Sequence, residues 1–120
     1  MVSKIWVPDR QDIIWIDFNP QVGREMKDMH PLLVLSPKEF NARTRIVIGL
    51  PMTTSPSNES NPFAVKFIGD KGKASYVLAH QPKSFDWQLR GAKPHPWKKV
   101  PIDVMSLVGN LLDQIITICD

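Results

Sequence analysis

The sequence contains little cysteine and no long apolar run. Cys119 is the single cysteine among 120 residues, which excludes an internal disulfide and any zinc site built from cysteines. A single cysteine is typical of a protein from a reducing compartment. No run of ~18 apolar residues is available to span a membrane, and the N-terminal segment lacks the apolar core of a signal peptide. We therefore expect a cytoplasmic protein with no membrane partner.

A large excess of charge of one sign is also missing. The 15 Lys and Arg residues exceed the 12 Asp and Glu residues by 3, which permits a polyanionic partner without requiring one. Proline, in contrast, is abundant, with 11 among 120 residues. Because proline breaks helices and central strands, this composition excludes a helix bundle and favours short elements joined by fixed turns. The length predicts one domain over residues 1–120.

Apolar runs predict a mainly β protein. The expected strands are residues 12–18, 32–36, 45–50, 63–68 and 75–79. Pro37 and Pro51 are expected to end the second and third of these strands. Residues 69–72 are predicted to form a hairpin turn, and residues 21–30 and 53–58 to form polar loops.

The C-terminal segment has helical rather than alternating periodicity. Pro101 suits the first position of a helix, and Asp103 suits its first turn. The apolar residues that recur at helical spacing are Val104, Leu107, Val108, Leu111, Leu112, Ile115 and Ile116. Residues 38–43 are predicted to form one helical turn. Short strands joined by tight turns curl most simply into a small barrel, here followed by an amphipathic helix.

Three features are candidates for a functional site. They are the polar loop 23–30, the pair Thr53 and Thr54 after an apolar strand, and the basic stretch 80–99. Polar residues at strand ends are held by a rigid scaffold and still reach solvent, which favours a site there. The alternative for the loop 23–30 is a solvated surface, and the alternative for Thr53 and Thr54 is an ordinary loop.

The basic stretch favours single-stranded nucleic acid as the partner. Residues 83–99 carry five Lys and Arg against the one acid Asp86, with Trp87 and Trp97 among them. Cations neutralise phosphates, and aromatic faces stack on unpaired bases. The alternative is a solvated basic face with both tryptophans in the core.

An ordered set of short segments runs through nearly the whole chain. It consists of residues 1–4, 7–9, 12–20, 23–25, 31–37, 40–41, 51–54 and 81–84, with Trp87 and residues 90–92. In order and spacing this set resembles the MazF/PemK family of toxin endoribonucleases, most closely the MazF branch.

The resemblance implies a fold, an activity and partners. The implied fold is a small SH3-like β-barrel (α+β, mainly β) that is shared with the gyrase poison CcdB and forms homodimers. The implied activity is metal-independent and cofactor-free cleavage of single-stranded RNA, often mRNA, which inhibits translation and growth. The products carry 2′,3′-cyclic phosphate and 5′-hydroxyl ends. The implied partner is a MazE-like antitoxin whose disordered tail occupies the RNA groove.

The catalytic residues carry over only in part. Thr53 matches the family threonine, and Glu25 matches the family glutamate. The family arginine before the buried proline strand is replaced by His30. Three further family residues, a glycine, a glutamine and an aspartate, are replaced by Gln11, Met26 and His80.

His30 is not a conservative replacement for arginine. Arginine stabilises phosphate oxygens bidentately, whereas histidine titrates near neutrality and performs acid–base work. One interpretation makes His30 the general acid or base, Thr53 a phosphate donor, and His80 or Arg24 the source of the missing positive charge. The other makes the protein a catalytically attenuated RNA-binding homologue. Glu25 is either a base or a residue that orients His30 or pairs with a loop lysine.

The remaining predicted contacts concern RNA binding. The residues expected there are Arg24, Lys27, Thr54, His80, Gln81, Lys83, Trp87 and Arg90. Trp15 and Phe18 lie on the first strand, where one faces the substrate or both pack in the core. A metal site made by Asp28, His30 and His80 is the weakest option, because residues on separate loops give no ligand spacing.

A function of another class is binding to gyrase through the C-terminal helix, as in CcdB. The end of this chain, residues 115–120, lacks the bulky aromatic residue that such a contact would use. This observation argues modestly against a gyrase-binding toxin.

Overall fold

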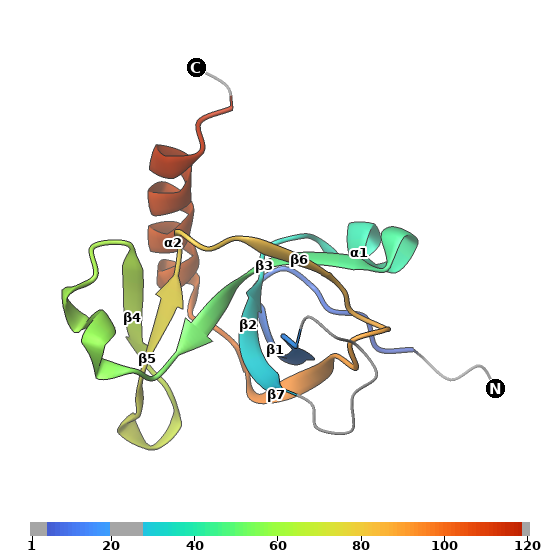
Figure 1. Ribbon diagram of the computed structural model, residues 1–120, viewed down its shortest axis with the longest axis horizontal. Helices are drawn as coiled ribbons and strands as arrows, with labels where there is room; N and C mark the ends of the chain where they lie inside the picture. The colour runs from blue at the N-terminus through green and yellow to red at the C-terminus, as the bar shows by residue number, and fades with distance from the viewer. Residues whose placement is uncertain (1–4, 20–27, 119–120) are drawn as a thin grey trace.

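The computed structural model describes residues 5–19 and 28–118, and Figure 1 shows the arrangement of their helices and strands. The seven strands are β1 Asp12–Asp17, β2 Met29–Val34, β3 Ile46–Thr53, β4 Ala64–Ile68, β5 Ala74–Leu78, β6 Lys83–Asp86 and β7 Lys93–Lys99. The helices are α1 Lys38–Thr44 and α2 Ile102–Ile115, with short 3-10 turns at η1 Pro56–Ser60 and η2 Asp70–Gly72. The hairpin turn predicted at residues 69–72 is confirmed, because η2 joins the paired strands β4 and β5.

All strand pairs are antiparallel, and β3 is the strand that two arms of the sheet share. The order is β4-β5-β3-β2-β1-β7, and β6 also pairs with β3. One edge of β3 pairs with β2; along its other edge, residues 46–49 pair with β6 and residues 52–53 with β5. The sheet curls into a half-barrel with the C-terminal helix beside it, which confirms the predicted fold class.

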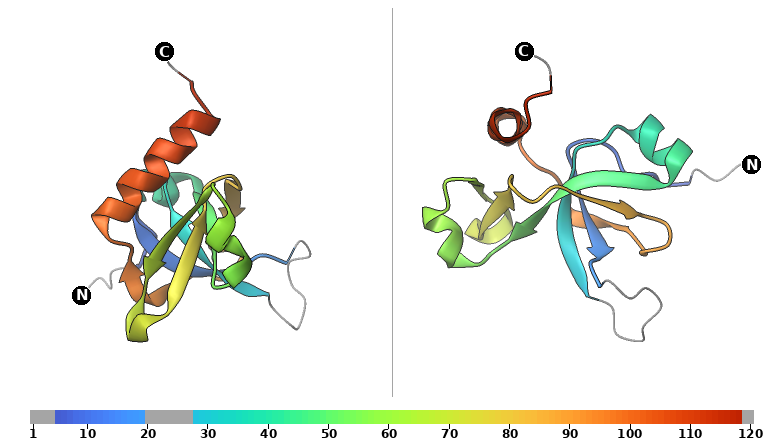
Figure 2. Two further views of the ribbon diagram at one scale, coloured as in Figure 1. Left: turned by 90° about the vertical axis from the view of Figure 1, so that its left-hand side faces the viewer. Right: turned by 45° about the horizontal axis from the view of Figure 1, so that its top comes forward.

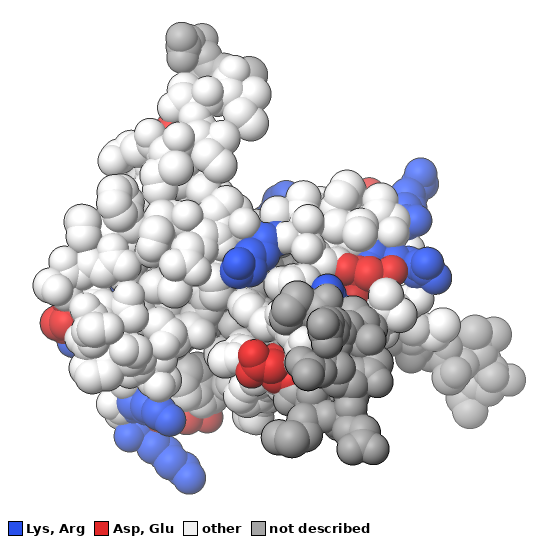
Figure 3. All heavy atoms as spheres, viewed as in Figure 1, with Lys and Arg blue, Asp and Glu red and all other residues white. Residues whose placement is uncertain are grey.

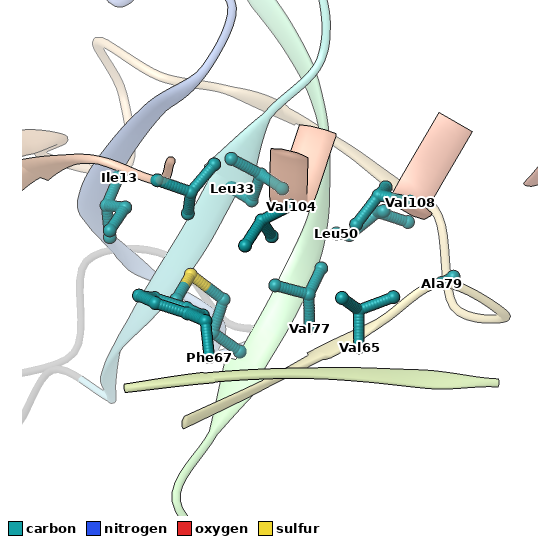
Figure 4. Close-up of a cluster of buried hydrophobic side chains, with 11 residues drawn as sticks. Ile13, Leu33, Leu50, Val65, Phe67, Val77, Ala79, Val104 and Val108 are labelled. Carbon is teal, nitrogen blue, oxygen red and sulfur yellow. The ribbon is translucent and has the colours of Figure 1, made fainter. Parts of the chain in front are cut away.

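Two apolar clusters lie on opposite faces of the central strands. In β1, Ile13 belongs to one cluster and Ile14 to the other, and Leu33 and Leu32 divide in the same way in β2. Figure 4 shows the first cluster, in which strand residues gather around Val104 of α2. The prediction that the second apolar run is buried on both faces is therefore confirmed.

The amphipathic helix α2 forms as predicted but buries only part of its apolar face. It begins at Ile102, one residue after Pro101, and carries Asp103 in its first turn. Val104 and Val108 are buried, while Leu107 is 53% exposed and Ile115 is 40% exposed. The helix crosses one end of the sheet beside β4 and β5, as the two views of Figure 2 show.

Pro51 does not end its strand, contrary to the prediction. β3 continues through Pro51 to Thr53. Pro51 is opposite Leu32 of β2 and lies between the last residue paired with β6, Gly49, and the first paired with β5, Met52. A proline is tolerated where the strand changes partner, because no ladder hydrogen bond is needed from it on that side.

The apolar runs predict no strand within residues 80–99, but β6 and β7 lie in this stretch. Pro94 and Pro96 of β7 are accommodated because β7 is an edge strand that pairs only with β1. The prediction of a loop up to residue 30 is also wrong at its end. Met29 and His30 already belong to β2, where His30 is opposite Ile16.

Gln11 has an unusual backbone conformation at a position where the resemblance implies glycine. Its φ of 83° lies in the left-handed region, where glycine carries no steric cost. The Gln11 side-chain amide donates to the carbonyl of Val100 at 2.7 Å, and the Gln11 backbone N–H donates to the carbonyl of Val34 at 2.8 Å. These hydrogen bonds hold a non-glycine residue in a conformation that glycine adopts more easily.

None of the helices in residues 5–19 and 28–118 combines the length and the apolar character needed to cross a membrane.

Gly49 provides a test of the contact between β2 and β3. A Cβ at this position would lie 2.9 Å from side-chain carbons of Leu32 and closer still to the carbonyl oxygen of Leu33. We expect Gly49→Ala to destabilise the protein by about 1–3 kcal/mol, because the two backbones must separate. The free energy of unfolding in urea measures the effect.

Gly109→Ala is the matched control for that substitution. A Cβ at Gly109 in α2 meets nothing within 4 Å, and alanine is the better helix former, so this variant is expected to gain up to about 1 kcal/mol. Equal stability of Gly49→Ala and the wild type would contradict the tight approach of the two strands.

Candidate functional site

One cavity collects side chains from several strands of the half-barrel. Its volume is about 440 Å³, within the range of small-ligand sites. Its lining residues are Trp15, His30, Pro31, Met52, Thr53, Thr54, Lys73, Ser75, His95 and Trp97. Three residues predicted from the sequence for catalysis or RNA binding, His30, Thr53 and Thr54, thus line one space.

His30 is held by a carboxylate two residues before it in the chain. Its Nε2 lies 2.7 Å from Oδ1 of Asp28, and the ring lies 5.2 Å from the ring of Phe18. Because a carboxylate only accepts hydrogen bonds, Nε2 is the donor, and in the neutral ring Nδ1 keeps its lone pair. The His30 side chain is 48% exposed, so this nitrogen is available to a substrate.

Asp28 is itself fixed by the buried end of β1. The backbone N–H of Asp28 donates to Oδ1 of Asp17 at 3.2 Å, and its carbonyl accepts from the N–H of Phe18 at 2.9 Å. The guanidinium of Arg90 donates to the carbonyls of Asp17 at 3.0 Å and Asn19 at 2.6 Å. Arg90 was predicted to contact RNA. In the structure, its guanidinium holds the backbone at the end of β1 in place.

Thr53 occupies the last position of β3 and presents a hydroxyl to the cavity. Its Oγ1 accepts from the backbone N–H of Ser55 at 3.1 Å, a short-range turn that orients the side chain. The hydroxyl proton is thereby directed away from Ser55, and we expect it to be available to an anionic ligand.

Lys73 supplies a positive charge that the sequence analysis assigned to His80 or Arg24. It lies immediately before β5, is exposed, and lines the same cavity as His30 and Thr53. Across residues 5–19 and 28–118, no ion pair engages its ammonium group. The charge is therefore free to meet a phosphate.

His95 is a cavity residue that the sequence analysis did not single out. The side chain is 8% exposed and stacks on Trp15 with ring centroids 4.7 Å apart. Burial lowers the pKa of His95 below its ordinary value, and the carboxylate of Asp70 opposes this in part. His95 is therefore neutral at physiological pH. In the sequence, His95 is noted only as a partial charge within the basic, aromatic stretch 83–99, and its burial in the neutral form contradicts that expectation.

Other predicted residues lie away from the cavity. His80 packs near Phe63, at 5.6 Å between ring centroids, and beside Gln81. Lys83 is exposed on β6, opposite Gly49. Figure 3 shows the Lys and Arg side chains of one face in separate groups rather than as one continuous patch.

Trp87 lies in the core. It is 5% exposed, its Nε1 donates to the carbonyl of Asn41 at 2.8 Å, and it packs edge-on against Trp6. A base cannot stack on this indole without rearrangement of the core, so the alternative of a buried tryptophan applies to Trp87. Trp15 faces the cavity, whereas Phe18 packs between His30 and Phe85.

Three predicted residues, Arg24, Glu25 and Lys27, lie outside the described residues, as do Met26 and Cys119. Within the described part of the chain, no three His, Cys, Asp or Glu side chains gather as metal ligands would.

The lowered pKa of His95 predicts a dependence of stability on pH. As the pH falls below 6.5, the unfolded chain takes up a proton at this residue before the folded chain does, so the free energy of unfolding decreases. We expect His95→Phe to reduce this slope by at most the uptake of one proton, because the substitution removes one titrating imidazole. Denaturation at a series of pH values measures both slopes. Identical slopes would contradict the burial of a neutral imidazole.

Comparison with known proteins identifies the family of this chain. Residues 9–116 match the family described as "PemK-like, MazF-like toxin of type II toxin-antitoxin system". The endoribonuclease toxin MazF of Escherichia coli K12 is 40% identical over 92 residues, covering 77% of this chain and 79% of that protein.

Solved structures agree as well. The crystal structure of MazF from Deinococcus radiodurans has a TM-score of 0.79 and 32% identity, covering 95% of this chain and 100% of that one. A MazE–MazF crystal structure from the same organism has a TM-score of 0.79 and 28% identity, covering 96% and 100%. The chain therefore belongs to the family of PemK-like and MazF-like toxins of type II toxin–antitoxin systems.

Proposed function

We propose that this protein is the toxin of a type II toxin–antitoxin system and cuts single-stranded RNA, with mRNA in the cytoplasm as its target. The observation that carries the proposal is the cavity in which His30, Thr53 and Lys73 meet. The relatives named above as MazF are endoribonucleases, which supports the same chemistry here. Cleavage leaves 2′,3′-cyclic phosphate and 5′-hydroxyl ends and requires no metal.

His30 is the general base of this reaction. The hydrogen bond from Nε2 to Asp28 places the proton on that nitrogen and leaves Nδ1 to take the proton of the attacking 2′-hydroxyl. The imidazolium formed in this step is stabilised by the Asp28 carboxylate. The departing 5′-oxygen, which lies across the phosphorus from the attacking oxygen, takes its proton from solvent, and the imidazolium then returns its proton to solvent.

Thr53 and Lys73 replace the charge stabilisation that an arginine supplies. The pentacoordinate phosphorus carries extra negative charge on its non-bridging oxygens, and donors already in place lower the energy of that state. The Thr53 hydroxyl at the end of β3 and the Lys73 ammonium immediately before the neighbouring β5 are such donors. Thr54, also in the lining, is proposed to bind the adjacent backbone phosphate. Glu25, Arg24 and Lys27 are proposed to contribute from the segment of the chain before Asp28.

The proposed partners are a second copy of the chain and a MazE-like antitoxin. Two hollows share Leu35 and Ile48 and together run from α1 to the end of α2. Ile48 is 39% exposed and Phe40 37% exposed, so this face presents apolar surface that a homodimer would cover. The relative from Deinococcus radiodurans was crystallised with MazE, which supports an antitoxin for this toxin.

The activity is tested on a long single-stranded RNA by sequencing the 5′ ends of the fragments. We expect His30→Ala to slow cleavage by about 10²–10⁴-fold, the usual contribution of a general base. We expect Asp28→Asn to slow it by about tenfold or more, because an amide can donate to Nε2 and force the proton onto Nδ1. Wild-type cleavage should persist in EDTA.

His80→Ala is the matched control, because His80 lies outside the cavity, and its effect is expected to stay within about threefold. Equal cleavage rates for His30→Ala and the wild type would contradict the role of His30 as the general base. A wild type that barely cuts, together with a His30→Arg variant that cuts well, would establish the attenuated homologue instead.

The homodimer is tested by sedimentation of a variant with a charge on the apolar face. Ile48→Glu is expected to shift the mass from twice the chain mass of 13.7 kDa to the chain mass, because an unpaired carboxylate resists burial. Ile68→Glu, at an isoleucine of β4 that is 58% exposed and outside both hollows, is the control and should leave the dimer intact. A dimeric Ile48→Glu variant would place the interface elsewhere.

A further inference from the structure

Three aromatic rings form one wall of the cavity and have no part in the proton transfers described above. Trp15 comes from β1, and His95 and Trp97 come from β7. The His95 ring is stacked on Trp15 and lies edge-on to Trp97, with ring centroids 5.1 Å apart. Both indoles are partly exposed and line the cavity.

The hydrogen bond made by His95 fixes which of its nitrogens faces a ligand. The backbone N–H of Trp97 donates to Nδ1 of His95 at 3.1 Å, so Nδ1 is the acceptor and the proton of the neutral ring lies on Nε2. Within the described part of the chain, Nε2 makes no hydrogen bond, and no buried side-chain nitrogen or oxygen lacks a partner. The Nε2–H group is therefore in contact with the open space of the cavity.

The Trp97 indole is held in place by packing against β4 and the turn that follows it. A Cβ on Gly69 would lie 2.5–2.6 Å from carbons of its six-membered ring, so the indole rests directly on the backbone of the turn between β4 and β5. Phe67 packs against the same indole edge-on, with ring centroids 6.0 Å apart. A wall that is ordered before binding loses little conformational entropy when a ligand arrives.

We propose that Trp15, His95 and Trp97 form a subsite for one unpaired base of the RNA, next to the phosphate that is cut. The Nε2–H of His95 donates to an acceptor on the edge of that base, and the partly exposed indoles contact its faces. Flat apolar surface combined with one neutral donor suits a nucleobase rather than a phosphate. The phosphate belongs at Lys73, the cationic part of the same lining. This proposal rests on the proposed function, since it assigns a part of the same substrate.

Sequencing of the 5′ ends tests the subsite during cleavage. His95→Phe keeps an aromatic ring between the tryptophans but removes the donor. We expect kcat/KM at the preferred sites to fall about tenfold, the usual cost of one lost hydrogen bond to a bound ligand. The base preference beside the cut should broaden, while kcat at saturating RNA stays within about threefold. His95→Gln, which retains an N–H donor, should recover part of the preference.

Gly69→Ala tests the wall without changing any residue that lines the cavity. Because the new Cβ displaces the Trp97 indole, the base preference should broaden as it does in His95→Phe. Circular dichroism and thermal denaturation check that the variants are folded. An unchanged distribution of cut sites in folded His95→Phe overturns the proposal.

A binding measurement separates this proposal from the proposed function. The probes are four homopolymeric 2′-O-methyl pentanucleotides, which lack the attacking hydroxyl and cannot be cut. We expect at least one of them to quench tryptophan fluorescence, with a dissociation constant about tenfold higher in His95→Phe and unchanged in His80→Phe.

The outcomes of the two measurements are distinct. His95-dependent binding by a protein that cuts no RNA would retain the subsite and reject the nuclease. Quenching by none of the four probes, or equal affinities in the wild type and His95→Phe, would reject the subsite even if the protein cuts RNA.

Discussion

The close approach of β2 and β3 is the constraint on which the site depends. At Gly49 the two backbones are so near that a single added carbon would meet the carbonyl of Leu33. This pairing sets the register in which β2 delivers His30 and β3 delivers Thr53 to the same cavity. Since side chains alternate between the faces of a strand, a slip of one residue would send one of the two groups to the wrong face. The chemistry therefore depends on a packing contact that takes no part in it.

The surroundings of His30, which stands where the family resemblance implies an arginine, suit an imidazole. A guanidinium carries its charge at every relevant pH and needs no partner to do so, whereas an imidazole needs a fixed tautomer to act as a base. Asp28 fixes that tautomer, and Asp17 fixes Asp28. Lys73, which lies immediately before β5, adds a cation to the same lining. In the proposed mechanism, the charge stabilisation passes to Thr53 and Lys73 and the proton transfer to His30.

Local pattern predicted much of the fold and less of the site. The apolar runs that became β1, β2 and α2 were found because each buries a periodic set of side chains. The strand β7 was missed because its two prolines are acceptable only at an edge, and whether a strand lies at an edge depends on pairing with the distant β1. Lys73 and His95 were missed as site residues for the same reason, since only the folded sheet brings them beside Thr53. The burial of Trp87 also depends on a distant partner, the carbonyl of Asn41.

The two kinds of group in the cavity are separated by their access to water. His95 is enclosed by indoles, where an added proton would be poorly solvated, and it stays neutral. Lys73 lies at the exposed part of the lining, where water solvates its charge, and the exposed His30 ring is hydrogen-bonded to the Asp28 carboxylate. A polyanionic chain that enters such a cavity would meet the Lys73 cation at its backbone and a neutral aromatic surface at its bases. The same hollow can therefore hold a phosphate for reaction and a base for recognition, because burial has already divided the charge between its two walls.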